Sequence, residues 1–156
     1  MFNQFRDAFS CLESHKVKYV IIGGVAVIIH GVGRTTIDLD ILIEATPENA
    51  KRLIEALLNA RLGTADLIDV PTLLSNEITI FSDRIRLDVQ TSTPGLLFSD
   101  AWDRKVVVEY GGQRINVASL QDLIASKEAA GRRIDMEDAV LLRLFLNDPD
   151  HQPLTK

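Results

Sequence analysis

The feature that most constrains the fold is an alternating segment, residues 38–44, in which apolar and acidic side chains take turns. Leu39 and Ile41 fall on one face of a strand, and Asp38 and Asp40 fall on the other, because successive side chains of a strand point to opposite faces. The segment therefore predicts a half-buried β-strand with two carboxylates on its open face. By the rise per residue, the two aspartates lie roughly 7 Å apart along the backbone.

The other periodicities predict a mixed chain, α/β or α+β in class. Apolar residues at helical spacing predict helices over residues 2–15, 25–30, 47–62, 119–130 and 135–146. β-Branched and aromatic runs predict strands over residues 17–22, 38–44, 77–81, 84–90, 105–110 and 113–117. We expect five to six of these strands to form one mixed sheet flanked by helices. Residues 63–76 show no regular pattern beyond one turn after Pro71.

Capping residues support two of the helices. Thr46 suits the N-cap position of the helix that starts at Pro47. Ser119 can cap the helix over residues 119–130, with Asp122 placed as in a capping box. Gly131 then ends that helix.

A chain of 156 residues is of the usual size for one domain. We expect a single domain over residues 1–146, with a core at about 17–117 and C-terminal helices at about 119–146. The tail, residues 147–156, is polar and contains proline, and we expect it to fray.

Composition excludes several classes of protein. The longest apolar run is broken by Gly23-Gly24, and no signal-peptide pattern is visible, so we expect no membrane span and a cytoplasmic location. The single cysteine, Cys11, excludes an internal disulfide and a cysteine-based zinc site. A net charge of −5 disfavours binding along a nucleic acid and favours a small anion held locally.

A third acidic residue occurs in a second alternating segment, residues 84–90. Apolar residues flank Asp88 there, so Asp88 projects from the open face as Asp38 and Asp40 do. If the two strands are neighbours, the three carboxylates converge. Oxygen ligands suit Mg²⁺ or Mn²⁺, and three carboxylates can hold two ions that bind phosphate oxygens. Acidic residues on an open strand face are also often merely solvated.

The residues upstream suit phosphate binding. Gly23-Gly24 lies between a predicted strand and a predicted helix, where backbone amides can bind phosphate, although a glycine pair can also form an ordinary turn. Arg34 and Thr36 precede the acidic pair and could contact phosphate or ribose. Both are equally compatible with an ordinary surface.

Together these motifs resemble the nucleotidyltransferase superfamily that shares the polymerase-beta-type palm, and within it the minimal prokaryotic branch that includes AbiEii-type toxin nucleotidyltransferases. The resemblance covers about residues 17–145 and rests on Gly23-Gly24, His30-Gly31, Arg34-x-Thr36-x-Asp38-Leu-Asp40, Asp88 and the segment from Lys127 to Asp135-x-x-Asp138. It implies a nucleotidyltransferase-like fold. It also implies transfer of a nucleoside monophosphate from an NTP to an acceptor hydroxyl, with release of pyrophosphate.

The resemblance also implies roles for the acidic residues. Asp38 and Asp40 would bind Mg²⁺ or Mn²⁺, with two ions expected. Asp88 would be the third metal-binding carboxylate and the general base.

The remaining roles concern the substrate. Gly23 and Gly24 would hold the triphosphate, with Arg34 and Thr36 beside them, and Lys127 would neutralise its charge. Asp135 would orient Lys127 or assist the acceptor. Many members of the superfamily have Gly-Ser where this chain has Gly23-Gly24, so a hydroxyl contact is missing.

Taken without the resemblance, some of these residues have simpler interpretations. Lys127 and Asp135 would form an exposed ion pair of little consequence. His30 would end a helix rather than bind a metal. Phe98 and Trp102 would pack a helix in a loop rather than stack a base.

Two other functions fit parts of the pattern. The first is a non-catalytic nucleotide-binding or interaction module of the same fold. The second is a glycosyltransferase with an Asp-x-Asp metal site, which would leave Gly23-Gly24 and Asp88 unexplained.

The acceptor of the expected transfer could be a protein, a tRNA or a small molecule such as an aminoglycoside. Further partners could be a second copy, paired through helices 2–15 and 135–146, or a cognate toxin or antitoxin.

Overall fold

A computed structural model describes residues 2–155. Its strands are β1 (Tyr19–Ile22), β2 (Asp38–Ile43), β3 (Ile78–Ser82), β4 (Arg86–Gln90), β5 (Val106–Tyr110) and β6 (Gln113–Val117). Its α-helices are α1 (Arg6–Ser14), α2 (Gly23–Ile29), α3 (Pro47–Asn59), α4 (Val70–Ser75), α5 (Phe98–Arg104), α6 (Leu120–Ala130) and α7 (Arg133–Leu146), and two 3₁₀ helices are η1 (Asn3–Phe5) and η2 (Gly63–Leu67).

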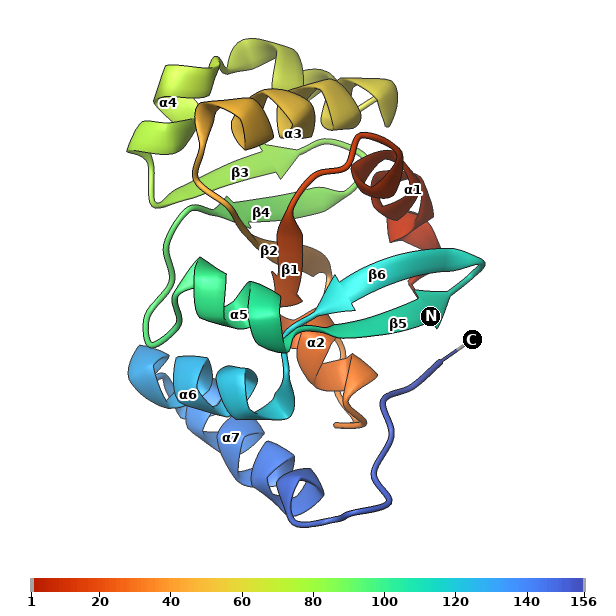
Figure 1. The fold of residues 1–156 in the computed structure, drawn as a ribbon, viewed down its shortest axis with the longest axis vertical. Helices are drawn as coiled ribbons and strands as arrows, with labels where there is room; N and C mark the ends of the chain where they lie inside the picture. Colours follow the sequence, from red (N-terminus) through yellow and green to blue (C-terminus); the bar gives the residue numbers. More distant parts are fainter. Residues whose placement is uncertain (1, 156) are drawn as a thin grey trace.

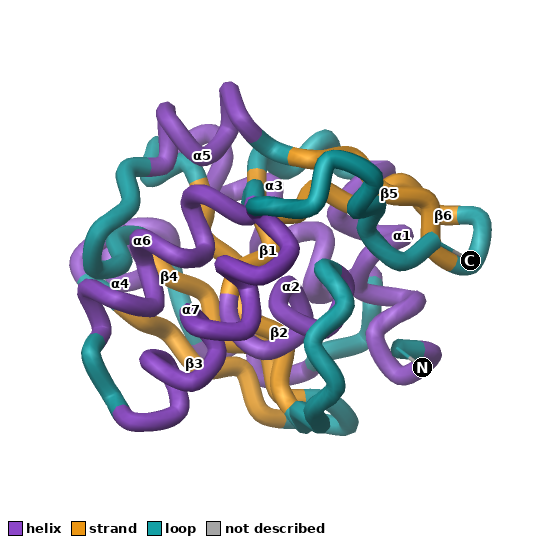
Figure 2. The backbone as a smooth tube through the Cα atoms, turned by 90° about the horizontal axis from the view of Figure 1, so that it is seen from below, coloured by secondary structure: helices purple, strands orange, loops and turns teal. Residues whose placement is uncertain are grey.

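The strands form one mixed six-stranded sheet in the order β3-β4-β2-β1-β6-β5. Helices α3 and α4 lie at one end of the molecule and α6 and α7 at the other, with the sheet between them (Figure 1). In the view from below, α6 and α7 lie in front of α2 and the strands (Figure 2). The expected mixed sheet flanked by helices is therefore confirmed.

The register of the central strands decides where the acidic residues lie. β2 pairs with β1 in antiparallel fashion and with β4 in parallel fashion, so that Asp40 stands opposite Asp88. β3 and β5 form the two edges of the sheet, each joined in an antiparallel hairpin to its neighbour. The two segments with alternating patterns are thus adjacent strands, as the convergence of their aspartates requires.

The apolar face of the alternating segments forms the core. Leu39, Ile41 and Leu87 are fully buried. Phe5 of η1 and Phe9 of α1 belong to the same core. The apolar face of α1 is thus used inside the molecule, and the expected pairing of that helix with a second copy stays a prediction.

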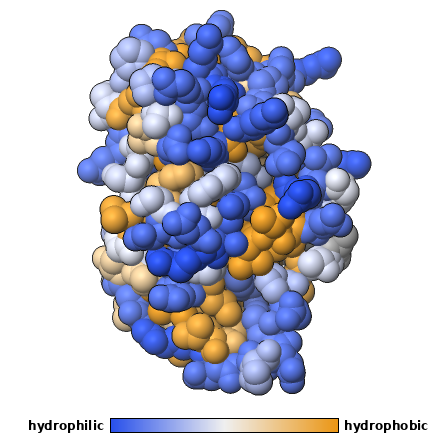
Figure 3. Space-filling model, in the orientation of Figure 1, coloured by the Kyte–Doolittle hydropathy of each residue, from blue (hydrophilic) through white to orange (hydrophobic). Residues whose placement is uncertain are grey.

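The face seen in Figure 3 is mostly hydrophilic, with apolar patches, one of which lies toward the end of the molecule formed by α6 and α7. On α7, Val140 and Leu144 are more than half exposed. None of the helices within residues 2–155 is long and apolar enough to cross a lipid bilayer.

Several element boundaries differ from the prediction by a few residues. α2 begins at Gly23 itself rather than after the glycine pair. α3 ends at Asn59 rather than near Leu62, because Arg61 adopts a left-handed conformation with φ of 60°. The turn expected after Pro71 is the short helix α4, whose start is capped by the Asp69 side chain accepting from the Thr72 N–H.

At the start of α6 the structure confirms Ser119 as the N-cap but not Asp122 as its capping-box partner. The Ser119 hydroxyl accepts from the Asp122 N–H at 3.2 Å, and Gly131 ends the helix with φ of 72°. The Asp122 carboxylate, however, does not complete the expected capping box. Both of its oxygens accept hydrogen bonds from Arg104 on α5.

The C-terminal tail packs against the rest of the chain, contrary to the expected fraying. The His151 ring stacks on Phe145 with centroids 4.4 Å apart. The Leu154 N–H donates to the Ile29 carbonyl at 2.7 Å. The tail therefore covers the end of α2.

We expect Ser119→Ala to lower the free energy of unfolding by about 1 kcal/mol, because the Asp122 N–H at the start of α6 loses its acceptor. Urea denaturation measures this change. Ser99→Ala, at an exposed position of α5, should change the value by less than about 0.5 kcal/mol. Equal losses in the two variants would show that the cap contributes nothing.

Candidate active site

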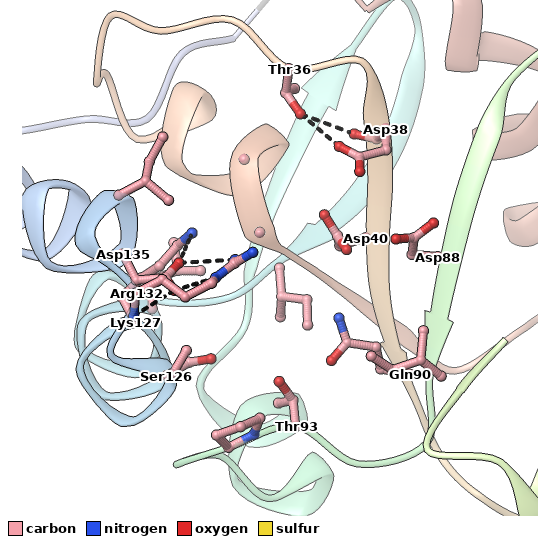
Figure 4. A pocket seen from close by; sticks show the side chains of 18 of the residues that line it. Thr36, Asp38, Asp40, Asp88, Gln90, Thr93, Ser126, Lys127, Arg132 and Asp135 are labelled. Atoms are coloured by element: carbon pink, nitrogen blue, oxygen red, sulfur yellow. Dashed lines mark hydrogen bonds and ion pairs between the residues drawn. The ribbon is translucent and has the colours of Figure 1, made fainter. Parts of the chain in front are cut away.

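The sheet and the C-terminal helices enclose a pocket with a volume of about 420 Å³, within the range typical of small-molecule sites. Its lining comes from the start of α2, from β2 and β4, from the loop after β4, and from α6 and α7. In Figure 4 the aspartates of the strands stand on one side of the pocket and the charged residues of the helices on the other.

Three carboxylates form the wall of the pocket on the sheet. Asp38 and Asp40 project from β2, and Asp88 projects from β4 on the same face (Figure 4). All three line the pocket. The structure therefore brings together the three acidic residues that the sequence singled out.

Arg86 interacts with this acidic wall. Its Nε and Nη2 atoms donate to the two carboxylate oxygens of Asp88 at 2.9 and 3.0 Å. Its Nε also lies 3.8 Å from Asp38 Oδ2. Arg86 was not among the predicted site residues, although its position two residues before Asp88 places both side chains on one strand face.

The donor chemistry of this wall fits a divalent cation, while its present geometry fits one only in part. Within residues 2–155, no three carboxylate, histidine or cysteine side chains stand close enough to hold an ion. Arg86 engages both oxygens of Asp88. Asp38 and Asp40 would hold Mg²⁺ or Mn²⁺ through oxygen ligands, and Asp88 would join them once Arg86 moves aside.

Asp40 is largely buried and lies close to the other two carboxylates. Its pKa is raised to about 6, first by burial and then by the negative charges of Asp38 and Asp88, against the opposing effect of Lys127 and Arg86. A cation between the carboxylates would relieve this repulsion.

Gly23 and Gly24 of α2 lack side chains at two points where Asp40 of β2 and Thr36, just before β2, lie against the helix. Gly23 has φ of 67°, and a Cβ atom on it would lie 2.3 Å from Asp40 Oδ2. A Cβ on Gly24 would lie 2.9 Å from the Thr36 hydroxyl oxygen. The two glycines therefore allow Asp40 and Thr36 to approach α2 closely. This packing role was not among the roles predicted for Gly23 and Gly24.

The opposite wall is a network of alternating charges that α6, α7 and the turn between them form with Arg34 of the loop before β2. Lys127 Nζ lies 3.1 Å from Asp135 Oδ1 and 3.1 Å from Asp138 Oδ2. Arg132 Nε donates to Asp135 Oδ2 at 2.7 Å. Asp138 also accepts a hydrogen bond from Arg34.

This network corrects the interpretation of Lys127 and Asp135 as an exposed ion pair. Lys127 is 8% exposed and Asp135 is 1% exposed. Burial alone would raise the pKa of Asp135, but hydrogen bonds from Arg132 and Lys127 outweigh it and hold the pKa below its ordinary value. Arg132 and Asp138 were not among the predicted site residues, although Asp135 and Asp138 share one helix face at i, i+3 spacing.

The remaining predicted residues also have partners within the protein. The Thr36 hydroxyl donates to Asp38 Oδ1 at 2.9 Å and so orients that carboxylate. His30 ends α2, as expected, with Nε2 at 2.7 Å from the Ala118 carbonyl oxygen. Trp102 packs on α5 against Phe98 with ring centroids 5.8 Å apart, which confirms a packing role.

Comparison with known proteins places this geometry in context. A family model described as "Nucleotidyltransferase of unknown function (DUF6036)" matches residues 3–150. A search of curated proteins found no match. Among solved structures, a Thermotoga maritima protein described as a "putative nucleotidyltransferase" superposes with a TM-score of 0.53 at 21% sequence identity, over 92% of this chain and 91% of that one. The likeness shows that the two proteins share a fold.

We expect Asp40→Asn to stabilise the metal-free protein at pH 7.5 by roughly 2–3 kcal/mol, the equivalent of about two pKa units. The folded protein holds the Asp40 proton more tightly than the unfolded chain does, so stability falls as pH rises from 3.8 through about 6. Urea denaturation between pH 4 and 7.5 should show the advantage of the variant vanish toward pH 4. The exposed Asp66→Asn variant serves as control, and an advantage independent of pH would contradict the assignment.

We expect Lys127→Met to lower the free energy of unfolding by roughly 3 kcal/mol, because Asp135 and Asp138 lose a shared buried partner. Chemical denaturation at neutral pH measures the loss. Lys51→Met, at an exposed position of α3, should stay within about 0.5 kcal/mol of the wild type. If Lys127→Met lowered the free energy of unfolding no more than Lys51→Met does, the ion-pair network would contribute nothing to stability.

Proposed function

The chain belongs to the DUF6036 family of nucleotidyltransferases of unknown function, and from this premise we propose that it transfers a nucleoside monophosphate from an NTP to an acceptor hydroxyl, with release of pyrophosphate. The observation that carries the proposal is the in-register arrangement of Asp38, Asp40 and Asp88 on two neighbouring strands. A binding fold alone has no need of three mutually repelling carboxylates on one wall.

The charges of the pocket suit this substrate. The sheet wall carries three carboxylates and one arginine, so it retains negative charge that a divalent cation can neutralise. The opposite wall carries three cations to two carboxylates in its network, so it retains positive charge toward the pocket. A triphosphate with its cation, held between the two walls, would complement both.

Asp88 is proposed to accept the proton of the attacking hydroxyl, and its arginine partner decides when it can. Both Asp88 oxygens accept hydrogen bonds from Arg86 in this structure. Turning Arg86 aside frees a lone pair for the hydroxyl proton. Arg86, at 44% side-chain exposure, has room to turn toward solvent.

The other residues bind and position. Lys127 and Arg132 are proposed to neutralise the phosphates from the helical wall, with Asp135 holding both cations in place. Gly23, Gly24 and Arg34 line the pocket where the triphosphate would lie. Thr36 orients Asp38. One or two Mg²⁺ or Mn²⁺ ions, held by the aspartates, would neutralise charge at the reacting phosphate.

A second candidate function is a non-catalytic nucleotide-binding module, and the bidentate pairing of Arg86 with Asp88 favours it. An arginine fixed in that position would replace a metal permanently. A role in a toxin–antitoxin pair, which rests on the resemblance to AbiEii-type proteins, is compatible with either candidate.

The proposed function is tested by incubating the protein with cell lysate, Mg²⁺ and NTPs labelled at either the α- or the γ-phosphate. We expect label from the α-phosphate alone to reach an acceptor, because the β- and γ-phosphates leave as pyrophosphate. The double variant Asp38→Ala/Asp40→Ala should lose at least 100-fold of the transfer. Asp66→Ala, outside the pocket, should retain it.

Two outcomes would contradict the proposal. Transfer that persists in the double variant would remove the carboxylates from the chemistry. NTP binding by calorimetry that needs no Mg²⁺, together with no transfer to any lysate component, would establish the non-catalytic module instead.

A further inference from the structure

The edge strand next to the acidic wall is apolar and open. β3 is the outermost strand of the sheet and pairs only with β4 among the strands of residues 2–155. Ile78 and Ile80 on this strand are 51% and 53% exposed. Exposed isoleucines on an edge strand are unusual, because such edges tend to pair with other chains.

The unpaired backbone groups of this edge can be assigned from the ladder. The Thr91 N–H donates to the Glu77 carbonyl, and the Asp83 N–H donates to the Ile85 carbonyl. In an antiparallel pair the inward- and outward-facing residues alternate. The N–H and C=O groups of the even-numbered residues of β3, Ile78 and Ile80 among them, therefore point away from β4.

The side chains of the same residues point to the catalytic face. Ile80 stands directly opposite Asp88, and Ile78 stands opposite Gln90. Opposed residues of an antiparallel pair lie on one face of the sheet. Ile78 also lines the pocket. The open edge is thus continuous with the acidic wall.

The residues of β3 offer no protection against pairing. The strand reads Ile-Thr-Ile-Phe-Ser, without the charged residue or proline by which edge strands usually discourage a neighbour. An extended peptide would find unpaired donors and acceptors along this edge and apolar contacts on one face, which is how peptides add to sheet edges.

The charges along β3 disfavour a polynucleotide at this edge. None of the residues of the strand is cationic, and the acidic residues Glu77 and Asp83 flank it. A polynucleotide needs several cations along its path to neutralise its phosphates. A polypeptide needs none.

We propose that the edge of β3 binds an extended polypeptide segment as an additional strand and that this segment belongs to the acceptor, which makes the acceptor a protein. The segment pairs with β3 and enters the pocket beside Ile78. The acceptor part rests on the proposed function. There, a hydroxyl oxygen of the segment attacks the α-phosphorus, its proton passes to Asp88, and the bond to the β-phosphate breaks to release pyrophosphate.

Peptide binding is tested first, without nucleotide, so that it does not depend on catalysis. The probe is a pooled library of lysine-flanked nonapeptides with Val, Ile, Thr, Ser and Tyr randomised in the centre. We expect the protein to enrich sequences that bind at least ten-fold more tightly than the same peptides N-methylated at four central residues. Equal retention of methylated and unmethylated peptides would overturn strand addition.

The location is tested by Ile80→Pro. Proline removes an outward N–H and is tolerated on the open side of an edge strand, so we expect the fold to persist and binding of the enriched peptides to fall at least ten-fold. Val107→Pro on β5 is the matched control. β5 and β6 are joined by the two-residue turn Gly111-Gly112, so the Val107 N–H also points outward at the opposite edge.

Thermal unfolding of both proline variants verifies that they are folded. If Ile80→Pro does not fold, Ile80→Thr, which keeps the backbone and shortens the side chain, should still weaken binding at least three-fold. Undiminished peptide binding in folded Ile80 variants would overturn the location.

The acceptor is tested last, with α-labelled NTP and Mg²⁺. We expect enriched peptides that carry a hydroxyl to become labelled by the wild type and by Val107→Pro, and at least ten-fold less by Ile80→Pro. Label on a tRNA pool that is equal in wild type and Ile80→Pro would overturn a protein acceptor while supporting the transferase. A dimer by sedimentation that Ile80→Pro dissociates would assign the edge to a second copy and overturn the proposal.

Discussion

Repulsion between like charges on neighbouring strands is the constraint to which the rest of the site responds. The parallel register of β2 and β4 sets Asp40 opposite Asp88, with Asp38 two residues away on the same face. Carboxylates so close together cannot all remain ionised without positive charge nearby. Arg86 supplies it from β4, and Lys127 supplies it from across the pocket, while burial and then the charges of Asp38 and Asp88 still raise the pKa of Asp40.

The helical wall, the network formed by Arg34, Lys127, Arg132, Asp135 and Asp138, also holds carboxylates close together, but there each carboxylate lies between two cations. There the charges alternate from Arg34 through Asp138, Lys127 and Asp135 to Arg132, so that each carboxylate has two cationic partners. Such a network is rigid, because moving one member exposes a buried charge. The sheet wall holds three carboxylates with one half-exposed arginine, while every carboxylate of the helical wall is paired with two cations. Binding of a charged substrate is therefore expected to rearrange the sheet side chains more than the helices.

Local patterns predicted what depends on local geometry. Strand alternation placed the aspartates on one face, and the caps at Thr46 and Ser119 marked where helices begin. The adjacency of β2 and β4 could only be assumed, because the two strands are separated in sequence by α3 and α4. The burial of Lys127 was missed for the same kind of reason: α7 packs back on α6 after Gly131, and spacing along the chain does not show what covers a side chain.

The close approach of Thr36 to Gly24 makes the residues allowed at one position depend on the residue at the other. A side chain at Gly24 would displace the Thr36 hydroxyl, and Thr36 in turn holds Asp38. The serine that many nucleotidyltransferases carry at this position would therefore reach the acidic wall through Thr36. The two positions are expected to be epistatic, so that a residue larger than glycine at 24 is accepted only in a sequence background with a smaller side chain at 36. Among relatives of this chain, the pair should vary together rather than independently.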